Sequence, residues 1–293
     1  MFKPREISLV TGSAVLAVTS VISSGAVAAP LPGGSLDPTT IPKYVTPLVI
    51  PPVMKNDGNN NSYDIAVRQF QQQILPGGIW ANLPGCTGQN CSFPPTTVWS
   101  YGPAADAVPA VAPDPGSQFN YPAYTVENTV NVTTSVAWIN DLKDPVTGAH
   151  LPHLLPLDQT LHWANPGTDC AAGAPRTDCR GTSQAPYTGP VPIVTHVHGA
   201  HVGPESDGYP EAWWLPDPTG SDFTCVTDPA LADNVTTFVC QGSLANGYGG
   251  TNTANGVGSF GYPNDQPSTT LWYHDHTLGM TRNNVYAGPA GFW

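Results

Sequence analysis

The clearest alternation of apolar and polar side chains lies within residues 124–140. One face of this segment carries Val130, Val132, Val136 and Trp138, and the other carries Asn131, Thr133 and Ser135. Successive side chains of a β-strand point to opposite faces of a sheet, so a repeat of two residues predicts a strand. We therefore expect residues 124–140 to form a strand with one buried face.

Four further apolar runs, each bounded by turn-forming residues, also predict strands. They cover residues 62–75, 96–102, 191–198 and 270–276. The segments between them are rich in Pro and Gly and are expected to be loops, above all 76–95, 103–117 and 199–217. We interpret the Gly-, Asn- and Thr-rich run at 242–258 as a solvated surface loop, with a functional lid as the alternative.

Composition supports a loop-rich all-β protein. The 293 residues include 33 Pro and 30 Gly, and only 10% are charged, which argues against long amphipathic helices. A chain of this length can bury a sizeable core in one or two domains. The formal net charge is −12, so the surface offers no footprint for nucleic acid or anionic lipid.

Residues 1–28 have the features of an export signal. Lys3 and Arg5 precede an apolar run, and Ala26 and Ala28 form a small-residue cleavage pattern. The run is too short and too rich in Ser, Thr and Gly to predict a membrane span. Because no Arg-Arg pair precedes it, we expect the Sec-type route and a secreted or periplasmic location. Residues 29–61 are expected to form an extended Pro-rich arm, and residues 62–293 a folded domain.

The six cysteines are consistent with export. An even number of cysteines in an exported chain predicts three disulfides, although six cysteines allow fifteen pairings. We expect near neighbours in sequence to pair, which gives Cys86–Cys91, Cys170–Cys179 and Cys225–Cys240. A thiolate metal site is the alternative, but a Cys-x4-Cys spacing with no second cysteine pair nearby is a poor zinc signature.

Two of the predicted strands end in His-x-His. His196 and His198 form one pair, and His274 and His276 form the other. Residues at i and i+2 share a face and lie roughly 6.6 Å apart at a rise of about 3.3 Å per residue. Because a ligand nitrogen lies only about 2 Å from its metal, two such pairs facing each other would bracket a cluster of ions. Imidazole suits copper, which we take to be the metal.

The bland interpretation of one such pair is a buried histidine that satisfies a backbone carbonyl, so the metal prediction depends on two copies in one chain. The remaining histidines lack a partner at ligand spacing. We interpret His150, His153 and His162 as structural, and His201 as a loop residue rather than a support of the metal site.

These motifs give the chain a resemblance to a known family. It resembles the first domain of a multicopper oxidase, particularly the bacterial laccase-like group that includes spore-coat laccase, bilirubin oxidase and phenoxazinone synthase. The resemblance spans about residues 43–293 and is carried by residues 151–156, 160–163, 195–199, 205–213, 271–276 and 281–283. It implies a cupredoxin-like Greek-key β-sandwich or barrel with long Pro- and Gly-rich loops.

The resemblance also implies roles for individual residues. Such enzymes carry a type 1 copper that takes electrons from the substrate and a trinuclear copper site that reduces dioxygen to water. By motif position, His196 would ligate the type 2 copper, and His198, His274 and His276 the type 3 pair. Asp207 matches an acidic residue that helps to deliver protons, although a turn residue before Gly208 is an equally good interpretation. We interpret Asp275 as a structural residue or a support of the ligands, and Met280 as packing.

The departures from the family pattern set a second expectation. The family's trinuclear site takes eight histidines from its first and last domains, whereas this chain supplies four. None of the six cysteines has a neighbouring histidine, so the type 1 site is absent, and the chain ends on the apolar residues 291–293. We therefore expect the N-terminal portion of a longer oxidase, truncated at its C-terminal end and inactive in isolation.

The complete enzyme would be a secreted copper-dependent oxidoreductase. It would use dioxygen and oxidise phenolic, aromatic amine, pigment or metal-ion substrates, with C-terminal cupredoxin domains completing the site. Two alternatives stay open: an exported copper-binding or storage protein without oxidase activity, and one subunit of an oxidase that another chain completes.

Overall fold

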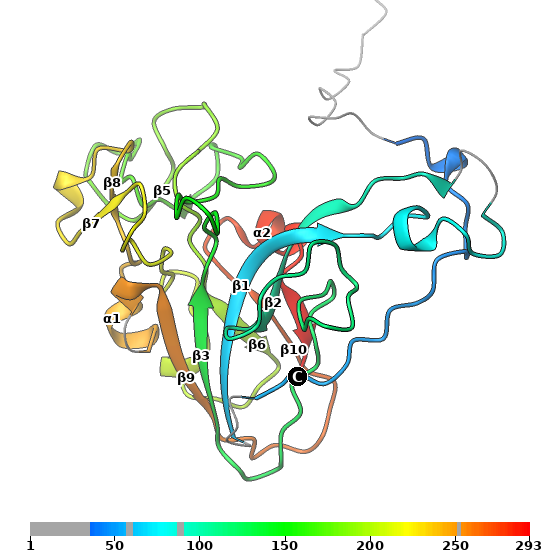
Figure 1. The fold of residues 1–293 in the computed structure, drawn as a ribbon. Coiled ribbons are helices and arrows are strands. Elements are labelled where there is room, and N and C mark those ends of the chain that lie inside the picture. Colours follow the sequence, from blue (N-terminus) through cyan, green and yellow to red (C-terminus); the bar gives the residue numbers. More distant parts are fainter. Residues whose placement is uncertain (1–35, 57–60, 87–90, 251–252) are drawn as a thin grey trace, which may run out of the picture. The chain divides into compact units, whose positions relative to one another are not determined.

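The computed structural model describes residues 36–56, 61–86, 91–250 and 253–293 (Figure 1). The chain divides into two units, Met1–Thr40 and Ile41–Trp293. Within the first, the described residues form the 3-10 turn η1 (Pro38–Thr40). The expected export signal, residues 1–28, lies outside the described residues, as does part of the arm expected at 29–61. Among the described residues, no helix has the length and apolarity needed to cross a bilayer.

The larger unit contains a four-stranded sheet with strand order β2-β1-β3-β9. The long strand β1 (Ser62–Gln72) pairs antiparallel with β2 (Thr96–Pro103) and parallel with β3 (Thr134–Asn140). Strand β9 (Val257–Tyr262) pairs antiparallel with β3. In Figure 1, β1, β3 and β9 run side by side although they come from distant parts of the chain.

A second sheet has three strands in the order β11-β10-β6. Its central strand β10 (Trp272–Asp275) pairs antiparallel with both β6 (Thr195–His198) and β11 (Ala290–Phe292). Two short ribbons pair β4 (Trp163–Ala164) with β5 (Asp178–Cys179) and β7 (Thr224–Val226) with β8 (Thr237–Val239).

The helices of the larger unit are short: η2 (Gly78–Trp80), η4 (Pro204–Ser206), η5 (Pro229–Leu231), α1 (Ala245–Tyr248), η6 (Thr253–Asn255) and α2 (Thr281–Ala287). Among the described residues strands outweigh the short helices, and the predicted all-β class is confirmed.

Aromatic side chains from both sheets meet in one buried core. Tyr101 of β2 and Trp138 of β3 both pack against Tyr273 of β10, with ring centroids 5.3 and 5.4 Å from the Tyr273 ring. Such aromatic pairs contribute about 0.5–1.5 kcal/mol each beyond the burial of apolar area. The hydroxyls of Tyr101 and Thr195 lie 3.1 Å apart and join β2 to β6. The core thus fixes one face of β10 and β6.

The strand expected over 124–140 is shorter than predicted. Only its second half, β3, is a strand, and Val136 and Trp138 are buried there as expected. Val130 is exposed, and Asn131 has a φ of 59°, in the left-handed region that a strand does not use. A backbone bond from Val132 to the Thr129 carbonyl closes a turn at this point. Alternating residues continue through the turn, so the pattern alone overstated the strand.

Two other predictions need correction. Of the strand expected over 191–198, only 195–198 belongs to β6. The preceding residues are buried, and Ile193 forms an isolated bridge with Trp214. The run at 242–258, expected to be a solvated loop, contains α1, η6 and the start of β9, and it buries Ala245, while residues 251–252 lie outside the described part.

The three predicted disulfides are present. Cys86 pairs with Cys91, Cys170 with Cys179, and Cys225 with Cys240. Each bond closes a short local loop, so the preference for near neighbours among the fifteen possible pairings is confirmed.

Candidate metal centre

The register of β6 and β10 assembles the candidate ligands. His274 lies directly opposite His196, and Trp272 lies opposite His198. Because residues two apart in a strand share a face, these four side chains lie on one face of the ribbon. The other face carries Thr195, Val197, Tyr273 and Asp275, all of which are buried. Burial of that second face therefore directs both His-x-His pairs to the same side.

The imidazoles lie within reach of shared metal ions. The ring centroid of His196 is 5.6 Å from those of His198 and His274, and 5.0 Å from that of His276. One ring nitrogen each from His196, His198 and His274 forms a group within 4.8 Å of one another. Nε2 of His274 and Nδ1 of His198 are 3.4 Å apart. The structure thus brings together all four histidines that the sequence singled out.

Backbone carbonyls fix the orientation of two of the rings. Nδ1 of His196 donates to the Asp207 carbonyl at 2.5 Å, and Nδ1 of His274 donates to the Asp275 carbonyl at 2.8 Å. A neutral imidazole with a proton on Nδ1 leaves the lone pair of Nε2 available to a metal, an arrangement common in metalloproteins. Both rings are therefore prepared to bind through Nε2.

His276 gives an independent sign that a group belongs at this site. Its Nδ1 is buried and has no hydrogen-bonding partner among the described residues. Leaving a buried polar atom unpaired is costly, so such atoms call for an explanation. A metal ion that approaches the imidazoles provides one, and the donor set fits copper, which prefers imidazole nitrogen.

Electrostatics keep the site in the form that binds metals. Burial lowers the pKa of His274 to about 4, and the neighbouring His196 lowers it further against the opposing bond to the Asp275 carbonyl. Burial, followed by the charge of His196, also lowers the pKa of His276. Both imidazoles are therefore neutral at neutral pH, and only the neutral ring offers a lone pair to a metal.

Asp207 lies beside His196 and still reaches solvent. It follows η4, and its carboxylate oxygen is 3.5 Å from His196 Nδ1 with the side chain 42% exposed. The next residue, Gly208, has a φ of 82°, and a Cβ there would lie 2.2 Å from the Thr195 carbonyl oxygen. Glycine thus lets the loop lie directly on β6. Asp207 is both the predicted turn residue and a neighbour of a candidate ligand.

Asp275 holds the end of β10 in place. Its carboxylate accepts hydrogen bonds from the Val194 backbone at 3.1 Å, the Thr277 hydroxyl at 2.7 Å and the Asn284 amide at 2.9 Å. Burial raises its pKa to about 6, against the opposing effect of these hydrogen bonds. Because Val194 precedes β6 and Asn284 lies in α2, this carboxylate joins three segments around the ligands. Met280 is fully buried in the core, as expected for packing.

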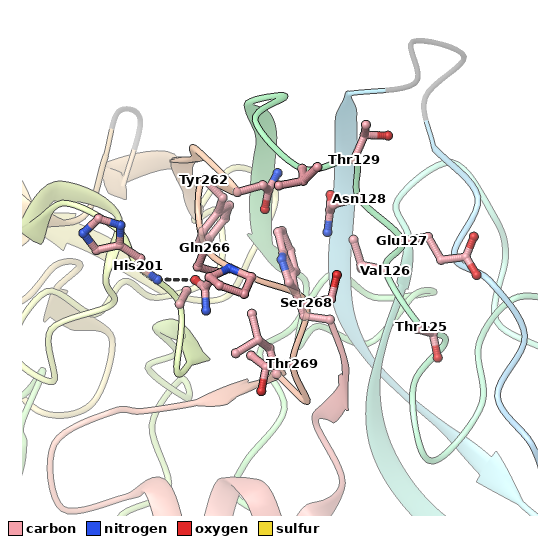
Figure 2. A pocket seen from close by; sticks show the side chains of 16 residues that line it. Thr125, Val126, Glu127, Asn128, Thr129, His201, Tyr262, Gln266, Ser268 and Thr269 are labelled. Atoms are coloured by element: carbon pink, nitrogen blue, oxygen red, sulfur yellow. Dashed lines mark hydrogen bonds between the residues drawn. The ribbon is translucent and has the colours of Figure 1, made fainter.

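The other histidines occupy structural positions. Nδ1 of His150 is 2.8 Å from Asp222, and Nε2 of His162 contacts the Asp178 carbonyl. His153 is half-buried with its Nε2 atom inaccessible to solvent, and desolvation lowers its pKa to about 3. His201 is 76% exposed and 2.8 Å from Asp265. Figure 2 shows its imidazole pointing away from a cavity of about 370 Å³ that none of the four candidate ligands lines.

Trp272 is a residue of the ligand face that the sequence analysis did not single out. Its indole stacks on the His274 ring with centroids 4.0 Å apart, and on the His198 ring with centroids 5.4 Å apart. The signal was present, because Trp272 stands two residues before His274 and must share its face.

Curated relatives of the chain are laccases and multicopper oxidases. The laccase of Bacillus stratosphericus is 28% identical over 254 residues, which cover 86% of this chain and 32% of that protein. The laccase of Haloferax volcanii is 29% identical over 261 residues, covering 87% of this chain and 31% of that protein. Multicopper oxidase LPR1 homolog 1 of Oryza sativa subsp. japonica is 31% identical over 201 residues, covering 68% of this chain and 22% of that protein.

Over this aligned part, the chain is a multicopper oxidase family member. It spans a third or less of the length of these relatives. No protein-family model matches it. A solved multi-copper oxidase from Pediococcus acidilactici overlaps 86% of this chain and 29% of its own, at 17% identity and a TM-score of 0.42. The family assignment rests on the sequence relatives. It implies copper for the imidazole cluster and agrees with the expected cupredoxin-like fold.

Proposed function

We propose that this chain is the N-terminal cupredoxin part of a laccase-like multicopper oxidase and supplies half of its trinuclear copper site. The observation that carries the proposal is the convergence of four imidazoles on one face of the β6–β10 ribbon. The complete protein would reduce dioxygen to water with electrons from a phenolic, aromatic amine, pigment or metal-ion substrate. It would be exported through the signal expected at residues 1–28.

In this proposal the ligands divide by their place in the motifs. His196 would hold the type 2 copper, and His198, His274 and His276 would hold the type 3 pair. Copper bound there would supply the electron transfer to dioxygen. The chain's own contribution is to present neutral nitrogen donors, which the carbonyls of Asp207 and Asp275 orient for two of the rings.

Asp207 is proposed to handle protons for the reaction. Making water from dioxygen consumes protons, and a carboxylate at the edge of the site is suited to relaying them. The support is positional: the Asp207 carboxylate lies 3.5 Å from Nδ1 of His196 and remains partly open to solvent. It can therefore exchange protons with water on one side and stand next to a ligand ring on the other.

Copper titration tests the metal site. The protein should bind Cu(II), and His196→Ala and His274→Ala should each weaken binding by at least about 10–100-fold, the range seen when the environment of a metal ligand is disturbed. His150→Ala is the matched control, because His150 is anchored to Asp222 away from the cluster. Equal copper binding by the wild-type protein and both ligand variants would contradict the site assignment.

Oxygen uptake tests the half-site proposal. The 293-residue chain with copper and a phenolic or azo-dye substrate should consume no oxygen, because it holds four of the histidines that the family's cluster requires and no His-Cys-His run. Adding the segment or chain that supplies the missing ligands should restore uptake. Robust uptake by this chain alone would overturn the idea that it needs completion.

A copper-binding or storage protein without oxidase activity is the second candidate. The observation in its favour is that nitrogens of three imidazoles from this one chain already lie within 4.8 Å of one another. Reading the genomic DNA beyond codon 293 separates the candidates. Further His-x-His and His-Cys-His codons favour the oxidase, and a stop codon with no such run elsewhere in the operon favours copper binding. Mass measurement with metal analysis identifies the case in which a second chain completes the site.

A further inference from the structure

On the ligand face of the β6–β10 ribbon, three of the four paired positions are histidines and the fourth is a tryptophan. His196 and His274 form one cross-strand pair, while His198 is paired with Trp272. Directly opposed side chains on one sheet face are in contact distance of each other. An indole has an N–H donor and no lone pair for a metal, so Trp272 cannot serve as a ligand. Its place among the ligands calls for another role.

The rings differ in what orients them. His196 and His274 each donate from Nδ1 to a backbone carbonyl. For His198, the His274 ring is the hydrogen-bonding partner found among the described residues, at 3.4 Å. What His198 has in addition is the Trp272 indole, stacked with an angle of 23° between the ring planes. The same indole stacks on His274 at an angle of 30°.

We propose that Trp272 is a positioning residue that sets the ring planes of His198 and His274 by stacking on both. The proposal rests on the copper function proposed above. Stacking replaces, for His198, the carbonyl anchor that the other two rings have. Neither nitrogen of His198 has a backbone partner among the described residues, so this ring can bind through Nδ1, the atom that already faces His274.

The alternative role for Trp272 is to form part of an apolar cavity wall. Trp272 and His274 both line an apolar cavity of about 870 Å³ together with residues of β2 and α2. If Trp272 served only as apolar wall, another large apolar side chain would replace it without consequence for the metal. If it orients the imidazoles, a flat aromatic ring is required. The two roles therefore predict different outcomes for Phe and Leu at this position.

The experiment compares Trp272→Leu and Trp272→Phe in the full chain by Cu(II) titration and by the electron paramagnetic resonance spectrum of the bound Cu(II). Trp272→Leu should weaken copper affinity by about 10-fold or more and change the copper hyperfine splitting, and Trp272→Phe should retain most of both. Tyr286→Leu is the matched control, because Tyr286 lines the same cavity and has no ring contact with the histidines. It should leave affinity and spectrum unchanged.

Unchanged affinity and spectrum in a folded Trp272→Leu protein would overturn the proposal. A second measurement covers the case in which that variant does not fold. Copper binding should quench tryptophan emission strongly in the wild type and less in Trp272→Phe, and equal quenching would also overturn it. A wild-type protein whose copper binding does not depend on His196 and His274 would instead reject the proposed copper site, and this inference with it.

Discussion

His153 is a histidine that could be mistaken for a metal ligand but belongs to the packing of the protein. Its imidazole lies between Trp99 and Tyr187, with ring centroids 6.0 Å from each. Nε2 is buried without a partner among the described residues, yet no second histidine faces it at ligand spacing. Burial lowers its pKa to about 3, so the folded protein holds it neutral. The cost of keeping that ring uncharged should appear as acid sensitivity.

The pH dependence of stability follows from that pKa. The folded pKa of about 3 lies below the unfolded value of about 6.5, so the unfolded chain binds more protons between these two values. The free energy of unfolding of the metal-free protein should therefore fall as pH drops through this window, by up to about 1.4 kcal/mol per pH unit from His153.

His153→Gln should flatten that slope in urea unfolding measured between about pH 6.5 and pH 4. His274 contributes with the same sign, because its pKa is also lowered. The difference in slope between the wild type and His153→Gln isolates the contribution of His153 to the pH dependence of stability. His150→Gln is the control, and a slope that is equally steep in His153→Gln would contradict the assignment.

At the level of elements, the sequence predicted the local features of single strands better than the pairing between distant strands. The His-x-His pairs could be predicted because a strand repeats every two residues, whatever lies around it. The pairing of His274 with His196 could not, because register is set by distant partners such as Tyr101 and Tyr273 that join the two sheets. Trp272 was missed for a related reason: an apolar residue in a strand looks like core until the strand's buried face is known.

The loop that follows η4 carries the sharpest prediction at this level. Gly208→Ala should push the loop away from β6, because the new methyl would overlap the Thr195 carbonyl. The Asp207 carbonyl would then leave His196 Nδ1. We expect a loss of more than about 1 kcal/mol in stability and weaker copper binding, measured by urea unfolding and copper titration.

Gly220→Ala is a matched control for the backbone strain. Gly220 has a φ of 71°, close to the 82° of Gly208, and no atom lies within 4 Å of the position of an added Cβ. It should lose stability through strain alone and keep its copper affinity. If both substitutions behave alike in copper titration, the contact between the loop and β6 does not orient His196.

For the whole molecule, the disulfides were predictable because sequence distance limits which pairs meet. The conformation of the segment expected to be a loop at 242–258 was less predictable, because α1 and η6 form where it packs onto neighbouring segments. Gly242, for example, leaves no room for a side chain against the Glu211 carbonyl. The fold class followed from composition and strand pattern, and the donor set from the two motifs. The assembly of both into one site required the three-dimensional pairing of β6 and β10.

The disulfides also give a prediction at this scale. Replacing Cys225 and Cys240 by Ser releases a loop with a sequence separation of 15, and replacing Cys86 and Cys91 releases one of 5. Loop-closure entropy assigns losses of about 3 and about 2 kcal/mol to these two changes. Thermal or urea unfolding of both double variants should give that order. The reverse order would show that native packing around the bonds outweighs the entropy of the unfolded chain.

The buried side of β10 has one more consequence. Tyr273 and Asp275 alternate with His274 and His276, so odd positions build the interior and even positions build the candidate metal site. A slip of one residue would exchange the two sets. The apolar contacts beneath the ribbon therefore align the imidazoles before any ion binds. Mutations that loosen those contacts should degrade metal affinity well before the protein unfolds.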